Sequence, residues 1–385
     1  MIYLDYNASA PPRPGVVEAM QSCLTRLIGN PSAVHAAGRA ARQGVDEARR
    51  QVARLINAHH SQVIFTSGGT EANSLALLGL AARAGFRGRL LLGATEHPSV
   101  LAVGQVLVRR GMEVDWIPVD ASGRVDPDWI RRELRAGLVA VSVMHANNET
   151  GVLQPIEEIG PLCRAAGVPL HTDAIQSAGR LPLDLATLPV ALLSISAHKL
   201  GGPKGVGALV VDKALAIEPL LVGGGQERNR RAGTENVAGI VGFGVAAAAA
   251  VAAMADEARR LGAWRDALEA DLAARMPDLH IFGRDAPRLP NTSLLGWPGL
   301  DGEALVMGLD LVGFAVSGGS ACSSGKVRAS HVVQAMGAEE ALGRSALRVS
   351  LGWDTRAEDL QRFREGLTGL VERLRRMSGP LAVGN

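Results

Sequence analysis

Cysteine and lysine are scarce in this chain, and each scarcity narrows the possible chemistry. Three of the 385 residues are cysteines, none of them in CxxC spacing: Cys23, Cys163 and Cys322. A sparse, odd set of this kind argues against a disulfide framework or a zinc site, and it fits a reducing cytoplasm. Any chemistry that needs a primary amine has only four candidates: Lys199, Lys204, Lys213 and Lys326.

The chain also lacks a surplus of charge and a secretory leader. It has 40 basic and 38 acidic residues, a net charge of +2, so a nucleic-acid partner is not indicated. Residues 1–12 have no basic region followed by an apolar run. The uncharged stretch 237–255 is long enough to span a bilayer but consists mostly of alanine and glycine. We interpret it as a buried helix and expect a cytoplasmic protein without a membrane partner.

Short apolar runs alternate with amphipathic stretches between residues 62 and 212. We predict strands at 63–66, 90–93, 114–119, 138–145, 169–172, 192–196 and 205–211, with helices at 70–84, 98–110, 127–136 and 155–166. This alternation predicts an α/β fold with a mostly parallel sheet and helices on both faces. The C-terminal third has predicted helices at 264–276 and 357–376 around short strands at 291–295 and 347–351. We therefore expect a second, smaller α/β domain there.

Polar clusters directly follow five of the predicted strands. They occupy residues 67–70, 96–97, 145–150, 173–176 and 196–199. Open parallel sheets bind ligands beyond the C-terminal ends of their strands. Five loops that bring polar groups to one edge therefore predict a single active site.

Two of these loops carry a lysine and a carboxylate that could face one planar ring. Lys199 follows the strand at 192–196, and Asp173 follows the strand at 169–172. A lysine at a buried sheet edge has a lowered pKa and is nucleophilic. The carboxylate could keep a pyridine nitrogen protonated, which is the arrangement that pyridoxal 5′-phosphate (PLP) needs. Two ordinary alternatives remain open: Lys199 could extend into solvent, and Asp173 could cap the next helix.

Other loops suit a phosphate group and a proton carrier. Residues 67–71 join a strand to a helix through two glycines, so free N–H groups and the Thr70 hydroxyl favour a phosphate. An ordinary helix cap is an equally good interpretation of that segment alone. Ser196 and His198 flank the lysine and could touch the same phosphate. His97 could stack on a flat cofactor and carry protons, although a lone histidine is more often structural.

Cys322 lies in a different setting from the other two cysteines. Residues 317–325 around it are otherwise serine, glycine and alanine, which predicts a flexible, exposed segment. An exposed thiol there can ionise and act as a nucleophile. Cys163 belongs to an apolar helical pattern and Cys23 to another helix-like stretch, so we expect both to be structural.

Nine collinear motifs cover nearly the whole chain and resemble those of cysteine desulfurases of the NifS/IscS type, in the class V aminotransferase superfamily of fold type I PLP enzymes. They are YLDYNASAPP (3–12), GNPSAVH (29–35), FTSGGTEAN (65–73), TEHPSV (95–100), MHANNETGVLQPI (144–156), HTDAIQSAGR (171–180), SAHKLGGPKGVGAL (196–209), GGGQERNRRAGTEN (223–236) and SGGSACSSG (317–325). The resemblance implies a large PLP-binding domain, residues 13–257, with a mainly parallel seven-stranded sheet. It also implies a small α/β domain, residues 1–12 and 258–385, which carries the cysteine loop 317–328.

The resemblance further implies a role for each matching residue. Lys199 would be bonded to PLP, His97 would stack on its ring, and Cys322 would accept the sulfur. The other PLP contacts would be Gly69, Thr70, Asp173, Gln176 (on the phenolic oxygen), Ser196, His198 and Thr234. Thr234 would reach the cofactor of the partner subunit, which implies a homodimer. Asn148 and Arg348 would hold the substrate carboxylate, a task that suits the bidentate geometry of arginine.

The implied reaction converts L-cysteine to L-alanine and leaves a persulfide on Cys322. The sulfur would then pass to an iron–sulfur scaffold or another sulfur-acceptor protein. No intrinsic metal is implied, beyond a transient bond of Cys322 to a nascent iron–sulfur cluster. Two alternatives stay open: another class V PLP reaction, such as transamination or selenocysteine cleavage, and a non-enzymatic or nucleotide-binding protein. Against the latter, the first βα unit lacks GxGxxG, and segment 319–326 is one residue too long for a P-loop.

Overall fold

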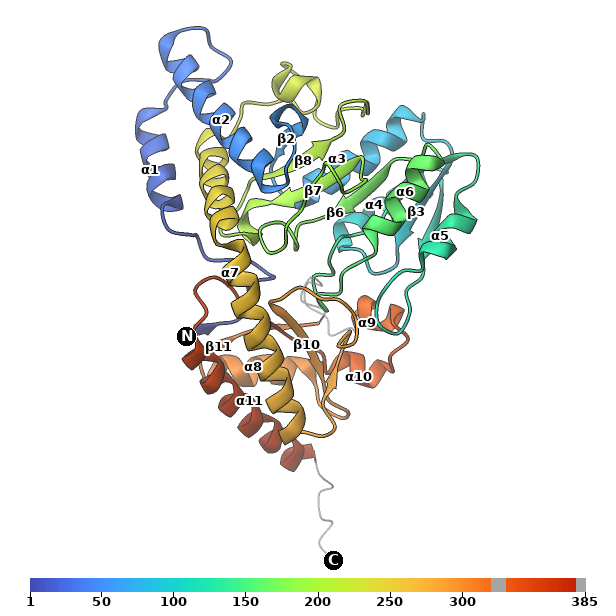
Figure 1. Ribbon diagram of the computed structural model, residues 1–385, viewed down its shortest axis with the longest axis vertical. Helices are drawn as coiled ribbons and strands as arrows, with labels where there is room; N and C mark the ends of the chain where they lie inside the picture. Colours follow the sequence, from blue (N-terminus) through green and yellow to red (C-terminus); the bar gives the residue numbers. More distant parts are fainter. Residues whose placement is uncertain (320–329, 379–385) are drawn as a thin grey trace, which may run out of the picture.

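A seven-stranded sheet lies at the centre of the larger part of the molecule (Figure 1). The computed structural model describes residues 1–319 and 330–378. Across the sheet the strands follow the order β2 (Val63–Thr66), β8 (Gly207–Val211), β7 (Leu192–Ser196), β6 (Leu170–Asp173), β5 (Leu138–Ser142), β3 (Arg89–Gly93) and β4 (Glu113–Ile117). Strand β8 is antiparallel to both neighbours, and the other pairs are parallel. The predicted mainly parallel sheet is confirmed, and because β2 runs in the same direction as β7, six strands end at one edge.

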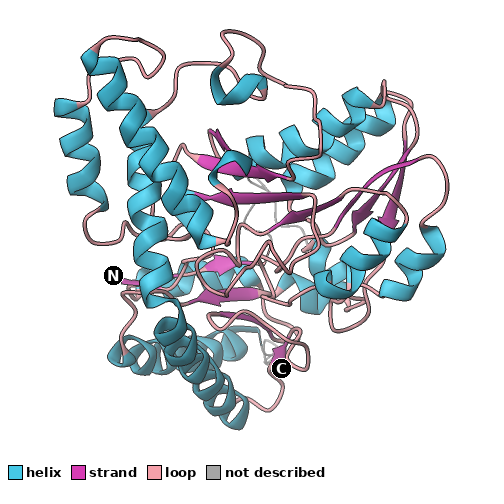
Figure 2. Cartoon of the chain, turned by 45° about the horizontal axis from the view of Figure 1, so that its top comes forward, coloured by secondary structure: helices cyan, strands magenta, loops and turns pink. Residues whose placement is uncertain are grey.

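Helices cover both faces of this sheet (Figure 2), which explains why its central strands are apolar. One face is covered by α3 (Gly69–Arg83) and α4 (Pro98–Arg109), and the other by α1 (Val16–Arg26), α2 (Ala36–Leu55), α5 (Pro127–Glu133), α6 (Ile156–Ala165) and part of α7 (Val237–Arg275). Side chains of a strand alternate between the faces: Leu90 and Leu92 of β3 join the core under α3 and α4, and Leu91 joins the opposite core. Each buried leucine stabilises the fold by about 1.5–3 kcal/mol. Polar groups are therefore kept to the ends of the strands.

Helix α7 connects the two parts of the molecule (Figure 1). Its 39 residues form one continuous helix, whereas the sequence analysis expected separate helices at 237–255 and 264–276. By length and composition α7 could cross a membrane, yet it packs against α1, α2 and α11 (Ala357–Ser378), and half of its most apolar stretch is buried. A Cβ at Gly244 would lie 2.7 Å from the Ala48 Cα of α2, so glycine permits this close approach. The helix is a core helix, as predicted.

The C-terminal part of the chain forms a second hydrophobic core, which Ile2 and Leu4 of the N-terminal segment join. Its sheet is antiparallel and has the order β12 (Ser317–Gly318), β13 (Leu347–Ser350), β10 (Thr292–Gly296) and β9 (His280–Ile281). Beside it, the N-terminal strand β1 (Ile2–Tyr3) pairs in parallel with β11 (Phe314–Ala315). The helices of this part are α8 (Gly302–Leu311), α9 (His331–Ala335), α10 (Glu340–Arg344) and α11, and short 3-10 helices elsewhere are η1 (His60–Gln62), η2 (Ala197–Lys199) and η3 (Gln226–Asn229). The expected domain boundary at 257/258 falls inside α7, and the division into domains stays a prediction.

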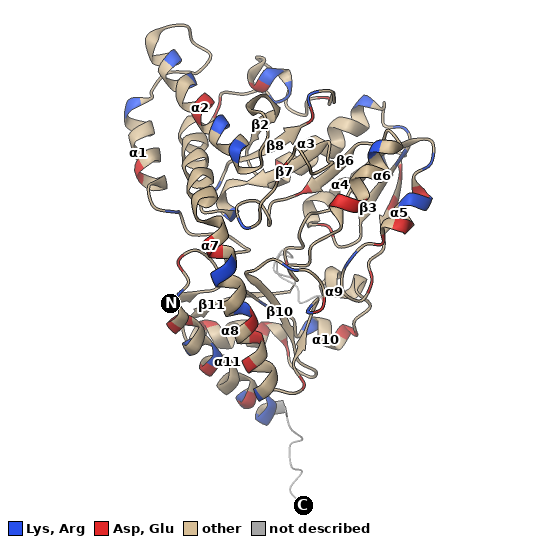
Figure 3. Ribbon diagram, viewed as in Figure 1, with Lys and Arg blue, Asp and Glu red and all other residues tan. Residues whose placement is uncertain are grey.

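Charged residues of both signs are interspersed over the helices (Figure 3). Helix α11 shows this well, because acidic and basic residues share its surface, and Arg364 lies 3.4 Å from Asp271 of α7. Charged groups with one sign do not gather on that helix, and its apolar side packs into the second core through Phe363 and Leu367. The surface pattern thus agrees with the nearly balanced net charge of the sequence.

Candidate active site

The loops that follow the strands meet around a cavity of about 170 Å³ at the C-terminal edge of the large sheet. It is lined by most of the predicted site residues, namely Gly69, Thr70, His97, Asn148, Asp173, Gln176, Ser196, His198 and Lys199, together with Met144 and Ile175. The structure thus brings together side chains from five separate loops, as the strand pattern predicted. The roles assigned to them stay predictions.

Lys199 lies in η2, directly after the buried strand β7. Its Nζ donates hydrogen bonds to the backbone oxygens of Asn7 and Ala8, the latter at 3.0 Å. Those oxygens belong to the N-terminal segment, which the sequence analysis did not connect with the lysine. The side chain therefore extends along the cavity to a neighbouring segment and not simply into solvent. Such an amine is well placed to react with a group bound in the cavity.

Asp173 ends β6, the strand next to β7, and is buried. Its Oδ1 accepts a hydrogen bond from the Ile175 N–H (3.0 Å), but residues 174–191 form turns without a helix, so the helix-cap interpretation is wrong. Its Oδ2 accepts a hydrogen bond from Asn73 Nδ2 at 2.7 Å. The sequence analysis missed Asn73. A signal was present, because Asn73 follows Thr70 by three residues and so lies on the same face of α3.

Asn73 also connects the carboxylate to His97. Its Nδ2 donates to Ser99 Oγ at 2.9 Å, and that oxygen lies 2.8 Å from His97 Nδ1. The Ser99 N–H donates to the same Nδ1 at 3.1 Å, so the neutral ring carries its hydrogen on Nε2. Burial lowers the pKa of His97, Asp173 opposes this shift, and Lys199 adds to it. His97 is thus a neutral N–H donor at pH 7.

The end of the cavity beside α3 has groups that suit an anion. Gly69 begins α3, and the first N–H groups of a helix have no partner within that helix. Ser196 Oγ is buried and has no hydrogen-bond partner within residues 1–319 and 330–378. Burial, reinforced by Lys199 and Lys204, lowers the pKa of His198 to about 4, so its ring is neutral at pH 7. This end of the cavity can therefore hold a phosphate group.

Arg348 lies behind Asn148 and does not itself line the cavity. It is only 2% exposed, its Nη1 donates to the Asn148 carbonyl at 3.1 Å, and its Nη2 forms an ion pair with Asp5 at 2.8 Å. Arg348 Nε and Asn148 Oδ1 have no hydrogen-bond partner among the described residues. The sequence analysis missed Asp5, although it belongs to the N-terminal motif. An incoming carboxylate could accept a hydrogen bond from Arg348 Nε, whereas Asn148 Oδ1 needs a donor such as an incoming N–H group.

The two remaining predicted residues are not in the cavity of this chain. Thr234 is exposed, in the connection between η3 and α7. Cys322 lies outside the described residues. The described residues on either side of its segment approach Glu149: Ser330 Oγ donates to Glu149 Oε2, and a Cβ at Gly319 would lie 3.6 Å from that oxygen. Both ends of the segment that contains Cys322 therefore adjoin the loop that carries Asn148.

Nearly the whole chain is similar to known proteins. The family model described as aminotransferase class-V matches residues 2–363. The cysteine desulfurase IscS of Dictyoglomus turgidum is 42% identical over 378 residues, which cover 98% of this chain and 96% of that protein. The cysteine desulfurase NifS of Azotobacter vinelandii is 40% identical over 385 residues, 100% of this chain and 96% of that protein. Among solved structures, a NifS-like protein has a TM-score of 0.91 at 32% identity and covers 97% of this chain and 100% of its own. SspA in complex with cysteine has a TM-score of 0.80 at 32% identity, covering 91% and 99%.

Proposed function

This chain belongs to the aminotransferase class-V family and, within it, is a cysteine desulfurase; from that premise we propose that it binds PLP in the 170 Å³ cavity and carries sulfur on Cys322. In the proposed reaction the Cβ–S bond of L-cysteine breaks and a bond forms between that sulfur and the Cys322 sulfur. The Cβ takes up a proton, and the products are L-alanine and a Cys322 persulfide. No external oxidant or reductant is needed, because one C–S and one S–H bond are exchanged for one S–S and one C–H bond.

One observation carries the PLP assignment: Lys199 and Asp173 line the same cavity from the ends of neighbouring strands. Bound PLP supplies an electron-withdrawing ring. The residues fit this group, because the buried Ser196 hydroxyl without a partner and the start of α3 suit its phosphate. The Asp173 carboxylate, fixed by Asn73, suits the ring nitrogen. The scarcity of lysine supports the same choice, since Lys199 is the lysine that lines the cavity.

Three side chains would then handle the substrate. Arg348 and Asn148 would bind its carboxylate by donating from the Arg348 Nε and the Asn148 Nδ2, and the Arg348 Nε would gain the partner that it lacks among the described residues. Lys199 Nζ would move the proton at the substrate Cα. His97, neutral and protonated on Nε2, would donate a proton or hydrogen bond near the departing sulfur.

The exposed position of Thr234 supports a homodimer. Next to its loop lies an exposed apolar stretch, Leu220–Val222, and the Leu221 carbonyl accepts a hydrogen bond from the Ala232 N–H at 3.0 Å. An apolar surface beside a hydroxyl that has no hydrogen-bond partner among the described residues suits contact with a second copy. Thr234 would then reach the phosphate held by the partner subunit. An iron–sulfur scaffold or another sulfur carrier would accept the sulfur.

Mass spectrometry after mixing with L-cysteine tests the proposal. We expect L-alanine to form and the peptide with Cys322 to gain the mass of one sulfur atom. Cys322→Ser should abolish both, and Lys199→Ala should abolish the visible absorbance of bound PLP. Cys163→Ser is the matched control, because burial raises the pKa of that thiol to about 12 and keeps it unreactive. L-Alanine formation by Cys322→Ser at the wild-type rate would overturn the sulfur-carrier role and favour another PLP reaction.

A further inference from the structure

Arg180 lies beside the cavity and has no role in the reaction as proposed above. Its Nη1 donates hydrogen bonds to Asn7 Oδ1 (2.8 Å), Gln176 Oε1 (2.7 Å) and the Gln176 carbonyl (3.1 Å). Its Nη2 donates to the carbonyls of Tyr6 (3.2 Å) and Lys199 (3.4 Å). One guanidinium thus joins the N-terminal segment, the turn after β6 and the loop of the reactive lysine.

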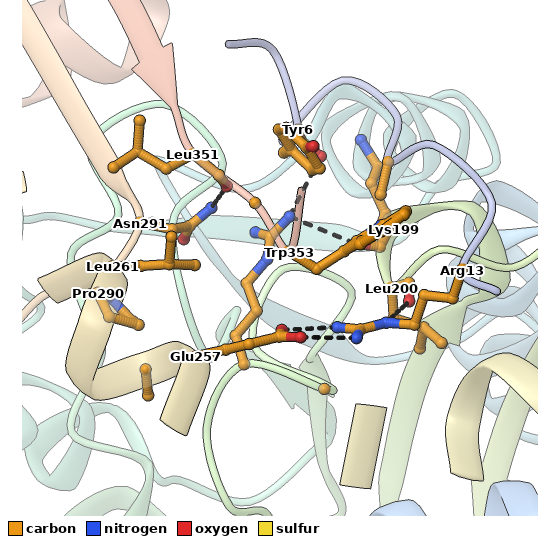
Figure 4. A pocket seen from close by; sticks show the side chains of 15 residues that line it. Tyr6, Arg13, Lys199, Leu200, Glu257, Leu261, Pro290, Asn291, Leu351 and Trp353 are labelled. Carbon is orange, nitrogen blue, oxygen red and sulfur yellow. Dashed lines mark hydrogen bonds and ion pairs between the residues drawn. The ribbon is translucent and has the colours of Figure 1, made fainter. Parts of the chain in front are cut away.

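All of these acceptors are neutral, so Arg180 has no carboxylate among its hydrogen-bond partners in the part of the chain that the structure describes. The acidic group whose charge acts on it is Glu257, whose two oxygens each accept a 2.7 Å bond from Arg13 (Figure 4). Burial, with repulsion from Arg348 and Arg13, lowers the pKa of Arg180 to about 9, so it stays charged at neutral pH. A buried cation without a direct counter-charge is costly, and neutral side chains could tie the same segments together. The charge itself therefore calls for an explanation.

The contact with Gln176 gives a first reason for an arginine at position 180. A guanidinium can only donate hydrogen bonds, whereas an amide has one accepting end and one donating end. Because Arg180 occupies Gln176 Oε1, the amide nitrogen must take the other position, where it donates to the Asn7 carbonyl at 3.0 Å. Gln176 lines the cavity, so its second N–H remains for a ligand. Rotation of the amide would replace this donor with an acceptor.

The contact with the loop that carries Lys199 gives a second reason. Arg180 binds the Lys199 carbonyl, and Arg13 Nε binds the next carbonyl, that of Leu200, at 2.9 Å (Figure 4). Two cations therefore fix consecutive peptide groups of the loop that carries the reactive amine. A nearby positive charge disfavours the protonated state of a nitrogen. The charge of Arg180, held at the Lys199 carbonyl, has the sign that would favour the unprotonated, reactive form of the lysine nitrogen.

We propose that Arg180 is a positioning residue that holds the Gln176 amide with its donor toward an acceptor oxygen on the cofactor ring, and that its charge lowers the proton affinity of the Lys199 nitrogen. This inference rests on the proposed function, because it takes PLP as the occupant of the cavity. The inferred role of Arg180 does not require contact between Arg180 and the substrate. Its consequences can be measured without turnover.

The pH dependence of the visible absorbance of bound PLP reports both effects. In Arg180→Gln the loss of the cation and of the fixed donor should raise the pH midpoint of that absorbance by roughly one unit. Arg180→Lys keeps the positive charge but loses the hydrogen bonds that the guanidinium donates through both Nη1 and Nη2. Its pH midpoint should therefore lie between those of Arg180→Gln and the wild type. Arg288→Gln is the matched control: it removes a different buried arginine, one that forms an ion pair with Glu269 at 2.8 Å. It should lower thermal stability and leave the midpoint unchanged.

A double-mutant cycle separates action through Gln176 from a general effect on the site. In a Gln176→Leu background, Arg180→Gln should shift the midpoint by clearly less than in the wild type, because the amide that it orients is gone. Equal shifts in both backgrounds would overturn the positioning of Gln176. An unchanged midpoint in Arg180→Gln would overturn the whole inference. A wild-type protein that binds no PLP would instead refute the proposed function, so the two failures are distinguishable.

Discussion

Gly69→Ala should weaken PLP binding with little loss of stability. A Cβ at position 69 would lie 2.2 Å from Ile175 Cδ1 and 3.1 Å from its Cγ1, well inside the 3.5–4.0 Å at which carbon atoms rest. The contact is with the end of a side chain that lines the cavity, so Ile175 can relieve it by rotating toward the ligand. Gly69→Ala thus does more than add a methyl group beside an unchanged N–H, because the new Cβ displaces Ile175.

The change in PLP affinity depends on which group moves to relieve the close contact. Overpacking of this kind costs about 1–3 kcal/mol. If Ile175 moves into the cavity, this free-energy cost weakens PLP binding, and the Kd for PLP should rise roughly 5- to 150-fold. Titration of the apo-protein with PLP, followed by absorbance, measures the Kd, and thermal unfolding of the same apo-protein measures stability.

Two further variants make the test decisive. Ile175→Ala in the Gly69→Ala background should restore most of the PLP affinity, because it removes the atoms that clash. Gly369→Ala in α11 is the matched control, since a Cβ there meets no atom within 4 Å and should leave the Kd unchanged. PLP binding by Gly69→Ala as tight as in the wild type, or no recovery in the double variant, would refute the reasoning.

Three other predictions follow from buried polar groups near the sheet. Burial lowers the pKa of His171 from 6.5 to about 3, so unfolding takes up a proton below pH 6.5 and the stability present above that pH is progressively lost on acidification. Urea unfolding of the wild type should lose about 2 kcal/mol more than that of His171→Gln between pH 7.5 and pH 5, and equal losses would contradict this. Burial raises the pKa of Glu149 from 4.5 to about 7, so its ionisation costs stability as the pH rises from 4.5 to 7; Glu149→Gln should raise the thermal midpoint at pH 8 but not at pH 5, and a uniform shift would count against it. Asn73→Ala removes the 2.7 Å bond to the Asp173 carboxylate and should weaken PLP binding by roughly one to two orders of magnitude, which an unchanged PLP titration would disprove.

The strands were predictable from the sequence because their signal is local. Runs such as Leu90–Leu92 are apolar since both faces of the sheet are covered, and the polar residues that follow them mark the strand ends. The direction of β8 was not predictable, because its antiparallel pairing with β2 and β7 is set by tertiary packing. Its consequence matters for the site, since it brings the end of β2, and with it Gly69, to the same edge as Lys199.

The length of α7 was also beyond the local signal. Charged residues and Gly262 follow the alanine-rich stretch, and this composition suggested a break between two helices. A glycine inside a helix costs only about 1 kcal/mol relative to alanine. Packing outweighs that cost, because Phe243 lies in the first core and Leu268 and Leu272 lie in the second. The helix stays continuous because both of its ends are held.

The site itself divides into two kinds of residue. Those that line the cavity follow strand ends and carry recognisable chemistry, so a sequence can reveal them. Those that orient the cavity residues are recognisable only by their contacts: Arg180 meets Asn7 across 173 positions of the chain, and Arg348 meets Asp5 across 343. A single sequence contains no signal for such pairs, because each partner alone is an ordinary polar residue.

These long-range contacts converge on the N-terminal segment, which gives that segment a definite physical role. The Asn7 carbonyl accepts hydrogen bonds from both Lys199 Nζ and Gln176 Nε2, and the Asn7 side-chain oxygen accepts one from Arg180. The same residue donates through Nδ2 to Thr292 Oγ1 in β10, at 2.9 Å. One asparagine therefore connects Lys199, Gln176 and the sheet of the second core. Arg348 of β13, which donates to the Asn148 carbonyl, makes a second connection between that sheet and the cavity, so the geometry of the site depends on both cores at once.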